Sequence, residues 1–260
     1  MSTALVTGPT SGIGQAFARR LASDGYDLVL VARDARRLES LAHEFSAGGV
    51  QVETLVADLA DAEQLAAVVE RLREAERPVE VLVNNAGFGI NQRFVGGDVD
   101  AEQSLIDVMV TAVMQLTHAA VPGMVERGRG SVINVSSIAG FLPFGTYSAV
   151  KSWVTFFTQG LATELEGTGV RVLVTCPGFV RTEFHERAGV DIDRSNDTWW
   201  LEVDDVVQQA MEDLRRGKVI SVPGRSYKAL AAGAHLIPRE ALRRAERFRR
   251  SRTVRARGVR

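Results

Sequence analysis

The chain has 260 residues, of which 45% are hydrophobic and 24% charged, with 31 basic and 32 acidic side chains and a formal net charge of −1. At roughly 150 residues per domain, this length predicts one large or two small globular domains with a substantial core. The composition excludes a disordered, collagen-like or disulfide-based protein, because apolar residues are abundant, no glycine repeat is present and Cys176 is the single cysteine.

Short apolar runs alternate with longer amphipathic stretches along most of the chain, which is typical of βα units around a buried parallel sheet. The predicted strands are Ala4–Thr7, Asp27–Val31, Gln51–Val56, Val79–Asn84, Gly130–Ser136, Val170–Thr175 and Lys218–Val222. The predicted helices are Ile13–Ser23, Ala35–Ser46, Ala62–Glu76, Ala101–Arg127, Tyr147–Glu166 and Asp204–Arg216. We therefore expect an α/β fold: a Rossmann-like, doubly wound, seven-stranded parallel sheet with helices on both faces, in a single domain.

The stretch 183–202 is irregular and rich in charge, and it carries Trp199 and Trp200. In an open α/β sheet, ligands bind outside the carboxyl ends of the strands, where this segment should emerge. The stretch is therefore predicted to be a substrate lid.

A glycine-rich segment, Thr7–Gly14, lies between the first predicted strand and the first predicted helix and reads TGPTSGIG. Glycines at this position permit a tight turn and close approach of the backbone to a diphosphate, while the helix N-terminus offers unpaired N–H groups to the anion. The segment predicts a dinucleotide site, and an ordinary glycine-rich turn is the alternative.

The spacing G-x-x-x-G-x-G, the Asn84–Gly87 segment after the fourth strand and the Tyr147-x-x-x-Lys151 pair together resemble the short-chain dehydrogenase/reductase family. The resemblance covers about residues 3 to 225. It implies an oxidoreductase that transfers a hydride between NADP(H) and an alcohol/carbonyl substrate, with carbonyl reduction as the favoured direction. The tyrosine–lysine pair is informative because the chain has only three tyrosines and three lysines, and positions i and i+4 share a helix face.

Three residues are implied to be catalytic by this resemblance. Tyr147 would protonate the carbonyl oxygen, and Ser137 would hydrogen-bond it, with Ser136 as the alternative serine. Lys151 would position the cofactor ribose. We expect the ammonium of Lys151 and the positive charge of a bound nicotinamide to lower the pKa of the Tyr147 phenol toward neutrality.

The end of the second strand favours NADP over NAD. Where the family's NAD enzymes carry an acid that holds the ribose, this chain has Ala32, and the following Arg33 could bind a 2′-phosphate bidentately. A solvated arginine is the alternative. Asp58 would accept a hydrogen bond from the adenine amino group, unless it is a turn or helix N-cap aspartate. The resemblance also places Asn84 along the cofactor.

The positions that the resemblance assigns to the cofactor site are Gly8, Thr10, Ser11, Gly12, Ile13, Gly14, Arg33, Asp58, Leu59, Asn85, Ala86, Gly87, Tyr147, Lys151, Pro177, Gly178, Val180 and Thr182.

One position departs from the family pattern. The family has an asparagine that supports a water-mediated proton relay from the lysine, and this chain has Met109. A thioether does not hydrogen-bond as an amide does. This departure motivates an alternative function, an NADP-binding scaffold or redox sensor with weak turnover.

Other reactive residue types give weaker signals. The four histidines show no metal-ligand spacing, so no metal site is expected. Cys176 is interpreted as a small buried residue rather than a reactive thiol. The aromatic residues available for an apolar substrate pocket, each with a core position as its alternative, are Trp153, Phe141, Phe144, Phe179, Phe184, Trp199 and Trp200.

The net charge is near zero because the negative charge of residues 1–238 is balanced by the positive charge of residues 239–260. Residues 239–260 contain ten arginines and two acids. We divide the chain into a catalytic domain, 1–225, and a helical basic extension, 226–260. The extension is interpreted as a solvated helix, with contact to an anionic membrane surface or an acidic subunit as alternatives. No nucleic-acid partner is expected.

Cellular context follows from the same features. We expect neither a signal peptide nor a membrane span, because the sequence enters its first predicted strand directly and contains no run of 18 or more apolar residues. We expect a cytoplasmic enzyme with a small-molecule substrate. The family resemblance implies a homo-oligomer, either a dimer or a tetramer.

Overall fold

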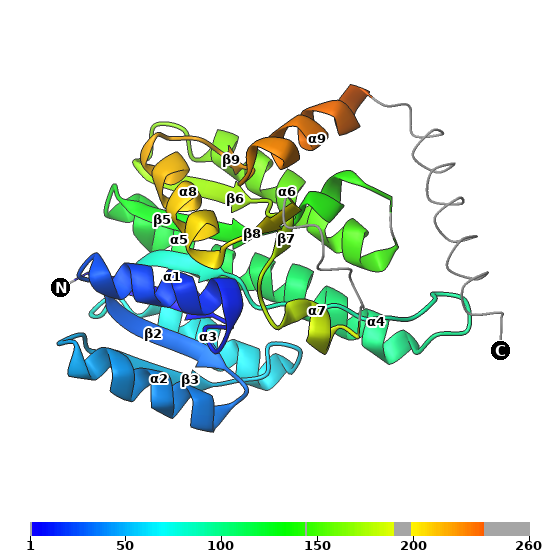
Figure 1. The fold of residues 1–260 in the computed structure, drawn as a ribbon. Helices are drawn as coiled ribbons and strands as arrows, with labels where there is room; N and C mark the ends of the chain where they lie inside the picture. Colours follow the sequence, from blue (N-terminus) through cyan, green and yellow to red (C-terminus); the bar gives the residue numbers. More distant parts are fainter. Residues whose placement is uncertain (1, 144, 190–198, 237–260) are drawn as a thin grey trace.

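The structure, a computed structural model, describes residues 2–143, 145–189 and 199–236 (Figure 1). Phe144, the middle of the predicted lid and the arginine-rich end lie outside these residues. The strands are β1 (Thr3–Thr7), β2 (Asp27–Ala32), β3 (Val52–Val56), β4 (Val79–Asn84), β5 (Gly130–Val135), β6 (Val170–Thr175), β7 (Phe179–Val180), β8 (Trp200–Leu201) and β9 (Ile220–Ser221). The α-helices are α1 (Gly12–Ser23), α2 (Ala35–Ala47), α3 (Ala62–Arg73), α4 (Val99–Ile106), α5 (Ala112–Glu126), α6 (Thr146–Glu164), α7 (Phe184–Arg187), α8 (Val203–Arg215) and α9 (Arg225–Leu236).

Seven strands form one sheet in the order β3-β2-β1-β4-β5-β6-β9, and each neighbouring pair is parallel. The expected seven-stranded, Rossmann-like sheet is confirmed. Strand order reverses between β1 and β4, and Leu5 of β1 lies between Val29 of β2 and Leu82 of β4. A ligand crevice is expected at the carboxyl ends of the strands beside this reversal.

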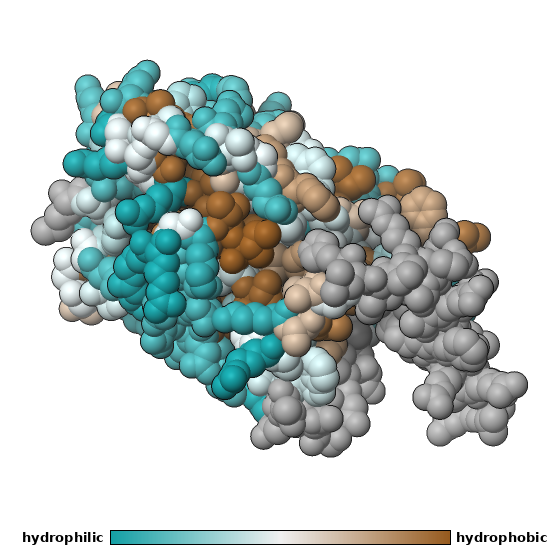
Figure 2. Space-filling view, turned by 90° about the horizontal axis from the view of Figure 1, so that it is seen from above, coloured by the Kyte–Doolittle hydropathy of each residue, from teal (hydrophilic) through white to brown (hydrophobic). Residues whose placement is uncertain are grey.

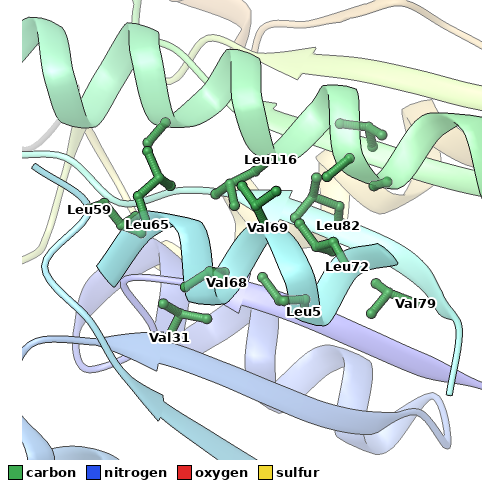
Figure 3. Packing of buried hydrophobic residues seen from close by; sticks show 14 of the residues in the cluster. Leu5, Val31, Leu59, Leu65, Val68, Val69, Leu72, Val79, Leu82 and Leu116 are labelled. Carbon is green, nitrogen blue, oxygen red and sulfur yellow. The ribbon is translucent and has the colours of Figure 1, made fainter. Parts of the chain in front are cut away.

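Helices cover both faces of the sheet, and each face has its own hydrophobic core. On one face, Val68, Leu72 and their neighbours on α3 pack against sheet residues such as Leu5 and against Leu116 of α5 (Figure 3). On the other face, α1, α2 and α8 pack around the fully buried Phe17. The buried strands are rich in valine and leucine because both of their faces lie under helices.

The predicted helix Ala101–Arg127 is observed as one helical segment, Val99–Glu126, which contains a π-helical turn. A π-helical turn, Asp107–Thr111, joins α4 to α5 and carries the buried Met109. The segment Val99–Glu126 is long and apolar enough to cross a membrane by length and composition alone. Half of its most apolar window is buried inside the molecule, as in a core helix, so it is weak evidence for a span.

Several predicted boundaries were wrong by a few residues. Helix α3 ends at Arg73 instead of Glu76, because the backbone of Glu74 turns to an extended conformation. The last strand pairs with β6 through Ile220 and Ser221 only. The four-residue helix α7 lies inside the predicted lid, as does β8, which pairs with β7 just before the lid; none of these elements was predicted.

The side of the molecule that is uppermost in Figure 1 carries a central group of hydrophobic residues, bordered on one side by hydrophilic residues (Figure 2). Helix α9 and strand β9 lie on this side, and their side chains Leu230 and Ile220 are partly exposed.

Candidate active site

The glycine-rich turn between β1 and α1 is built so that little besides glycine fits. Gly8 and Gly12 have positive φ values of 65° and 54°, which side-chain-bearing residues rarely adopt. A Cβ atom on Gly14 would lie 2.2 Å from the carbonyl oxygen of Gly8 and 2.3 Å from Asn85 Nδ2. The turn is thereby packed tightly against the end of β4.

Helix α1 begins at the carboxyl edge of the sheet, with Ser11 as its N-cap residue in extended conformation. In the described part of the chain the Ser11 side chain makes no capping hydrogen bond to α1. The first N–H groups of an α-helix have no intrahelical carbonyl partner, and in α1 they belong to the residues that follow Thr10 and Ser11, beginning with Gly12 and Ile13. This cradle fits the diphosphate of a dinucleotide, because it combines close backbone approach with the positive end of a helix.

The end of β2 lies beside this cradle. Arg33 is 70% exposed, and its Nη1 lies 3.4 Å from Asp58 Oδ2. Asp58 Oδ1 accepts a hydrogen bond from the amide of Ala60, so Asp58 is a turn aspartate, while Asp61 caps α3. Leu59 is buried. The structure therefore places the two predicted adenosine contacts, Arg33 and Asp58, next to each other.

At the end of β4, two consecutive asparagines point in different directions. Asn84 is buried and donates hydrogen bonds to Thr117 and Asn134, so its side chain belongs to the core and not to the cofactor site. Asn85 donates to the carbonyl oxygens of Thr7 and Gly8.

The next two residues are Ala86, which contacts the glycine-rich turn, and Gly87, which lies beside Met109 and Lys151. The amide of Ala86 donates to Thr7 Oγ1 at 3.0 Å. A Cβ atom on Gly87 would lie 2.9 Å from Met109 Sδ and 3.7 Å from Lys151 Nζ. Gly87 thus lets the methionine and the lysine come close to the β4 edge.

Ser137, Tyr147 and Lys151 come together at the carboxyl edge of β5. Tyr147 and Lys151 lie one turn apart on α6, with Lys151 Nζ 5.8 Å from the centre of the Tyr147 ring. Lys151 is 5% exposed, and its ammonium donates to the carbonyl oxygen of Val135 at 2.8 Å. Ser137 is in hydrogen-bond contact with Tyr147 and accepts from the amide of Ala139 at 3.1 Å.

The structure separates the two candidate serines. The hydroxyl of Ser136 donates to the carbonyl oxygen of Lys151 at 2.7 Å and contacts Thr155, all within the core. Ser137 instead stands beside the Tyr147 hydroxyl. The geometry therefore favours Ser137 over Ser136 as the serine that faces a reacting group.

Burial is the largest cause of the pKa shifts of Tyr147 and Lys151. It raises the pKa of Tyr147 to about 12, and a hydrogen bond with Ser137 offsets this increase only in part. It also lowers the pKa of Lys151 to about 8, with a smaller opposing effect of Cys176. The expectation that the ammonium lowers the pKa of Tyr147 was wrong for the protein by itself, because removal from water disfavours both charged forms.

The segment that follows β6 contacts both the turn that carries Ser137 and the glycine-rich turn. The carbonyl oxygen of Pro177 accepts from the amide of Ile138, which ties this segment to the turn that carries Ser137. Val180 is buried and pairs with Leu201. A Cβ atom on Gly12 would lie 3.0 Å from Thr182 Cγ2, so the residue just before the predicted lid packs against the glycine-rich turn.

Tyr227, a residue that the sequence did not single out, fixes this segment. Its hydroxyl donates to the carbonyl oxygen of Trp199 at 2.6 Å and accepts from the amide of Phe179 at 3.0 Å. A Cβ atom on Gly178 would meet the Tyr227 ring at 2.0 Å. A glycine opposite a buried tyrosine has no signature in a single sequence, because the two residues are far apart in the chain.

The predicted aromatic pocket divides into separate groups. Phe184 of α7 lies 6.0 Å from the Tyr147 ring, centre to centre. Trp153 stacks on Phe157 and packs beside a small core group with Phe141. Phe179 packs on Trp200, and Trp199 packs on Tyr227. The ring of Phe184 is thus placed beside that of Tyr147.

Cys176 is fully buried, and burial raises the pKa of its thiol to about 11, as expected of an inert core cysteine. In the described part of the chain, no group of three or more His, Cys, Asp or Glu residues is arranged to hold a metal ion.

Comparison with known proteins agrees with this geometry. The family model for short chain dehydrogenases matches residues 2–192. Sulfoacetaldehyde reductase 2 of Chromohalobacter salexigens is 40% identical over 215 residues, which cover 78% of this chain and 84% of that protein.

Solved structures also match the whole chain. A short-chain dehydrogenase from Sphingobium yanoikuyae in complex with NADPH is 36% identical, with a TM-score of 0.82, and 97% of that chain is covered. The bulky-bulky ketone specific alcohol dehydrogenase from Comamonas testosteroni is 29% identical, with a TM-score of 0.77 and 95% coverage. The chain belongs to the short-chain dehydrogenase family and is an oxidoreductase that uses a nicotinamide cofactor.

Proposed function

We propose that this enzyme reduces a ketone or an aldehyde to the alcohol with NADPH as the hydride donor, through Ser137, Tyr147 and Lys151. The observation that carries the proposal is the placement of the Ser137 and Tyr147 hydroxyl groups in contact at the sheet edge, one helical turn from a buried lysine. The glycine cradle opens at the same edge.

Each side chain has a distinct role in this reaction. The bound cofactor supplies the hydride for the carbonyl carbon. The Tyr147 hydroxyl donates a proton to the carbonyl oxygen, and Ser137 donates a hydrogen bond that polarises the same oxygen. Lys151 holds the nicotinamide ribose and favours the tyrosinate that remains after proton transfer. The high pKa of Tyr147 suits a group that must hold its proton until the substrate arrives.

The preference for NADP rests on charge at the end of β2. Ala32 leaves no carboxylate there to hold a ribose hydroxyl, and Arg33 and Arg37 follow within the next turn of chain. Guanidinium groups bind phosphate oxygens bidentately. The structurally similar Sphingobium enzyme is in complex with NADPH, which supports the same cofactor here.

The substrate is a small carbonyl compound that enters beside α7. The names of the relatives support this class, since they include a sulfoacetaldehyde reductase and a ketone-specific alcohol dehydrogenase. Phe184 forms an apolar wall beside Tyr147, and residues 183–202 act as the lid. Residues 1–225 are the catalytic domain and residues 226–260 a basic extension, whose first turn contributes Tyr227 to the support of the segment after β6.

The NADP-binding scaffold or redox sensor is not favoured as an alternative. Its main motive was Met109, which is buried in an ordinary apolar setting within the core. The catalytic side chains are present together, and the named relatives include reductases and dehydrogenases.

We further propose that the enzyme is a cytoplasmic homo-oligomer. Its single cysteine is usual for a reducing compartment. The exposed apolar side chains Met114 on α5 and Phe156 on α6 offer surface for a second copy of the chain. Light scattering of the wild type and of Phe156→Asp tests this assembly, and a monomeric wild type contradicts it.

The activity test measures NADPH consumption against a panel of ketones and aldehydes. Tyr147→Phe removes the proton donor, and we expect a loss in kcat/KM of about 100-fold or more. Tyr26→Phe, which removes a hydroxyl at the start of β2, is the control and should leave the rate unchanged. Equal rates for Tyr147→Phe and the wild type would refute the assignment.

A further inference from the structure

Tyr227, a side chain of α9, forms a hydrogen-bonded bridge between the short strands β7 and β8. Its hydroxyl accepts from the amide of Phe179 at 3.0 Å and donates to the carbonyl oxygen of Trp199 at 2.6 Å. Two residues further along, the amide of Arg181 donates to the carbonyl oxygen of Leu201 at 3.0 Å. The Tyr227 hydroxyl therefore extends the hydrogen-bonded ladder of β7 and β8 at its first pair.

The ring of Tyr227 has little room to move. It is 2% exposed, and Trp199 packs against it edge-on, with 5.5 Å between the ring centres. A Cβ atom on Gly178 would lie 2.0 Å from Tyr227 Cζ, and one on Gly224, in the turn before α9, would lie 3.3 Å from Cδ2. The φ of Gly224 is 85°, which also favours glycine. Two glycines thus let the chain close around this side chain, and the hydroxyl is fixed in place.

The segment that this bridge holds, residues 177–182, contacts both the catalytic turn and the diphosphate cradle. At its start, the carbonyl oxygen of Pro177 accepts from the amide of Ile138, the residue after the catalytic serine. At its end, Thr182 packs against Gly12 of the cradle. A dinucleotide with its diphosphate in the cradle has to reach the catalytic side chains with its nicotinamide half, and the segment lies along this path.

We propose that Tyr227 is a positioning residue for hydride transfer, which holds residues 177–182 as the wall against which the nicotinamide is placed. This inference rests on the proposed function and deepens it. Tyr227 acts through the backbone of the segment, because its hydroxyl is engaged by two backbone groups. The rate of transfer depends steeply on the placement of the reacting atoms, so a small displacement of this wall slows the chemical step.

The test uses Tyr227→Phe, which removes the bridging hydroxyl and keeps the ring that packs against Gly178. We expect kcat for NADPH-dependent reduction to fall about 10-fold, while KM for the carbonyl substrate changes by less than about 2-fold. Calorimetry should give an unchanged dissociation constant for 2′,5′-ADP, a ligand with the adenosine half of NADPH and without the nicotinamide. The control is Tyr26→Phe, which removes the same hydroxyl just before β2, at the edge of the sheet away from the site, and should leave kcat unchanged.

A second variant displaces the same segment by another route. Gly178→Ala keeps the Tyr227 hydroxyl, but its added Cβ atom cannot share the space of the ring. Its kcat should fall at least as far as that of Tyr227→Phe, and a wild-type kcat would contradict the proposal. In both variants the fluorescence emission of bound NADPH should differ from that of the wild type, because the surroundings of the reduced nicotinamide change.

A role in stability alone has a different signature. Tyr227→Phe would then lower the free energy of unfolding in urea, while kcat of the folded enzyme and the emission of bound NADPH stayed as in the wild type, and this result would overturn the proposal. Equal weakening of 2′,5′-ADP and NADPH would also overturn it, since the whole cofactor site would then be disturbed. Failure of the proposed function is distinguishable, because the wild type itself would neither bind NADPH nor consume it.

Discussion

The buried ammonium of Lys151 makes the stability of the cofactor-free enzyme depend on pH in a predictable direction. Burial lowers the pKa of Lys151 from 10.5 to about 8. The unfolded chain therefore binds more protons than the folded enzyme between these two values, and the free energy of unfolding rises with pH across this window. The total effect of the shift is about 3 kcal/mol, which opposes folding below pH 8 and is relieved toward pH 10.5.

The measurement is urea denaturation from pH 7 to pH 9.5, with Lys151→Met as the variant. Between these limits the free energy of unfolding of the wild type should rise by about 2 kcal/mol relative to the variant. The upper limit precedes the ionisation of unfolded tyrosine, where the raised pKa of Tyr147 would lower stability again. Lys228→Met, at an exposed position on α9, is the control and should follow the wild type. Parallel curves for wild type and Lys151→Met would refute the desolvation argument.

Three further predictions concern packing. Gly14→Ala places a methyl group 2.2 Å from the Gly8 carbonyl oxygen; it should lower the free energy of unfolding by about 3 kcal/mol in denaturant titrations and weaken NADPH binding in fluorescence titrations. Met109→Asn buries an amide in the core and should cost about 2 kcal/mol, whereas the volume-conserving Met109→Leu should cost less than about 1.5 kcal/mol; equal unfolding midpoints for the two would contradict this. Asp213→Ala leaves the buried hydroxyl of Ser221 without its 2.8 Å partner and should cost about 2 kcal/mol in thermal unfolding, and Asp213→Asn, which keeps an acceptor, should cost less.

Much of the fold could be predicted from local sequence patterns. The strands Val79–Asn84 and Val170–Thr175 were predicted to the residue, because buried parallel strands are short, apolar and bounded by turn residues. The π-helical turn at Asp107–Thr111 could not be predicted, because its hydrophobic pattern differs little from that of an α-helix. The β7–β8 pair was missed because two-residue strands have no periodicity to detect.

Some parts of the candidate site could likewise be predicted from the sequence, and others could not. The glycine-rich turn with Gly14 and the Tyr147–Lys151 pair are each local in sequence, so both motifs could be recognised there and carried the family resemblance. The choice between Ser136 and Ser137 needed the structure, since adjacent side chains on a strand end point in opposite directions. The contact between Ser11 and Arg187 joins residues 176 positions apart, so no spacing rule predicts it.

Transfer of deuterium tests the central claim most directly. The enzyme is incubated with a carbonyl substrate from the panel and with NADPH that carries deuterium at the transferable position of C4, and the alcohol product is analysed by mass spectrometry. The account predicts one deuterium on the carbinol carbon for the wild type and product formation at least about 100-fold slower with Tyr147→Phe. Alcohol without deuterium, or the same rate of product formation in Tyr147→Phe, would contradict it.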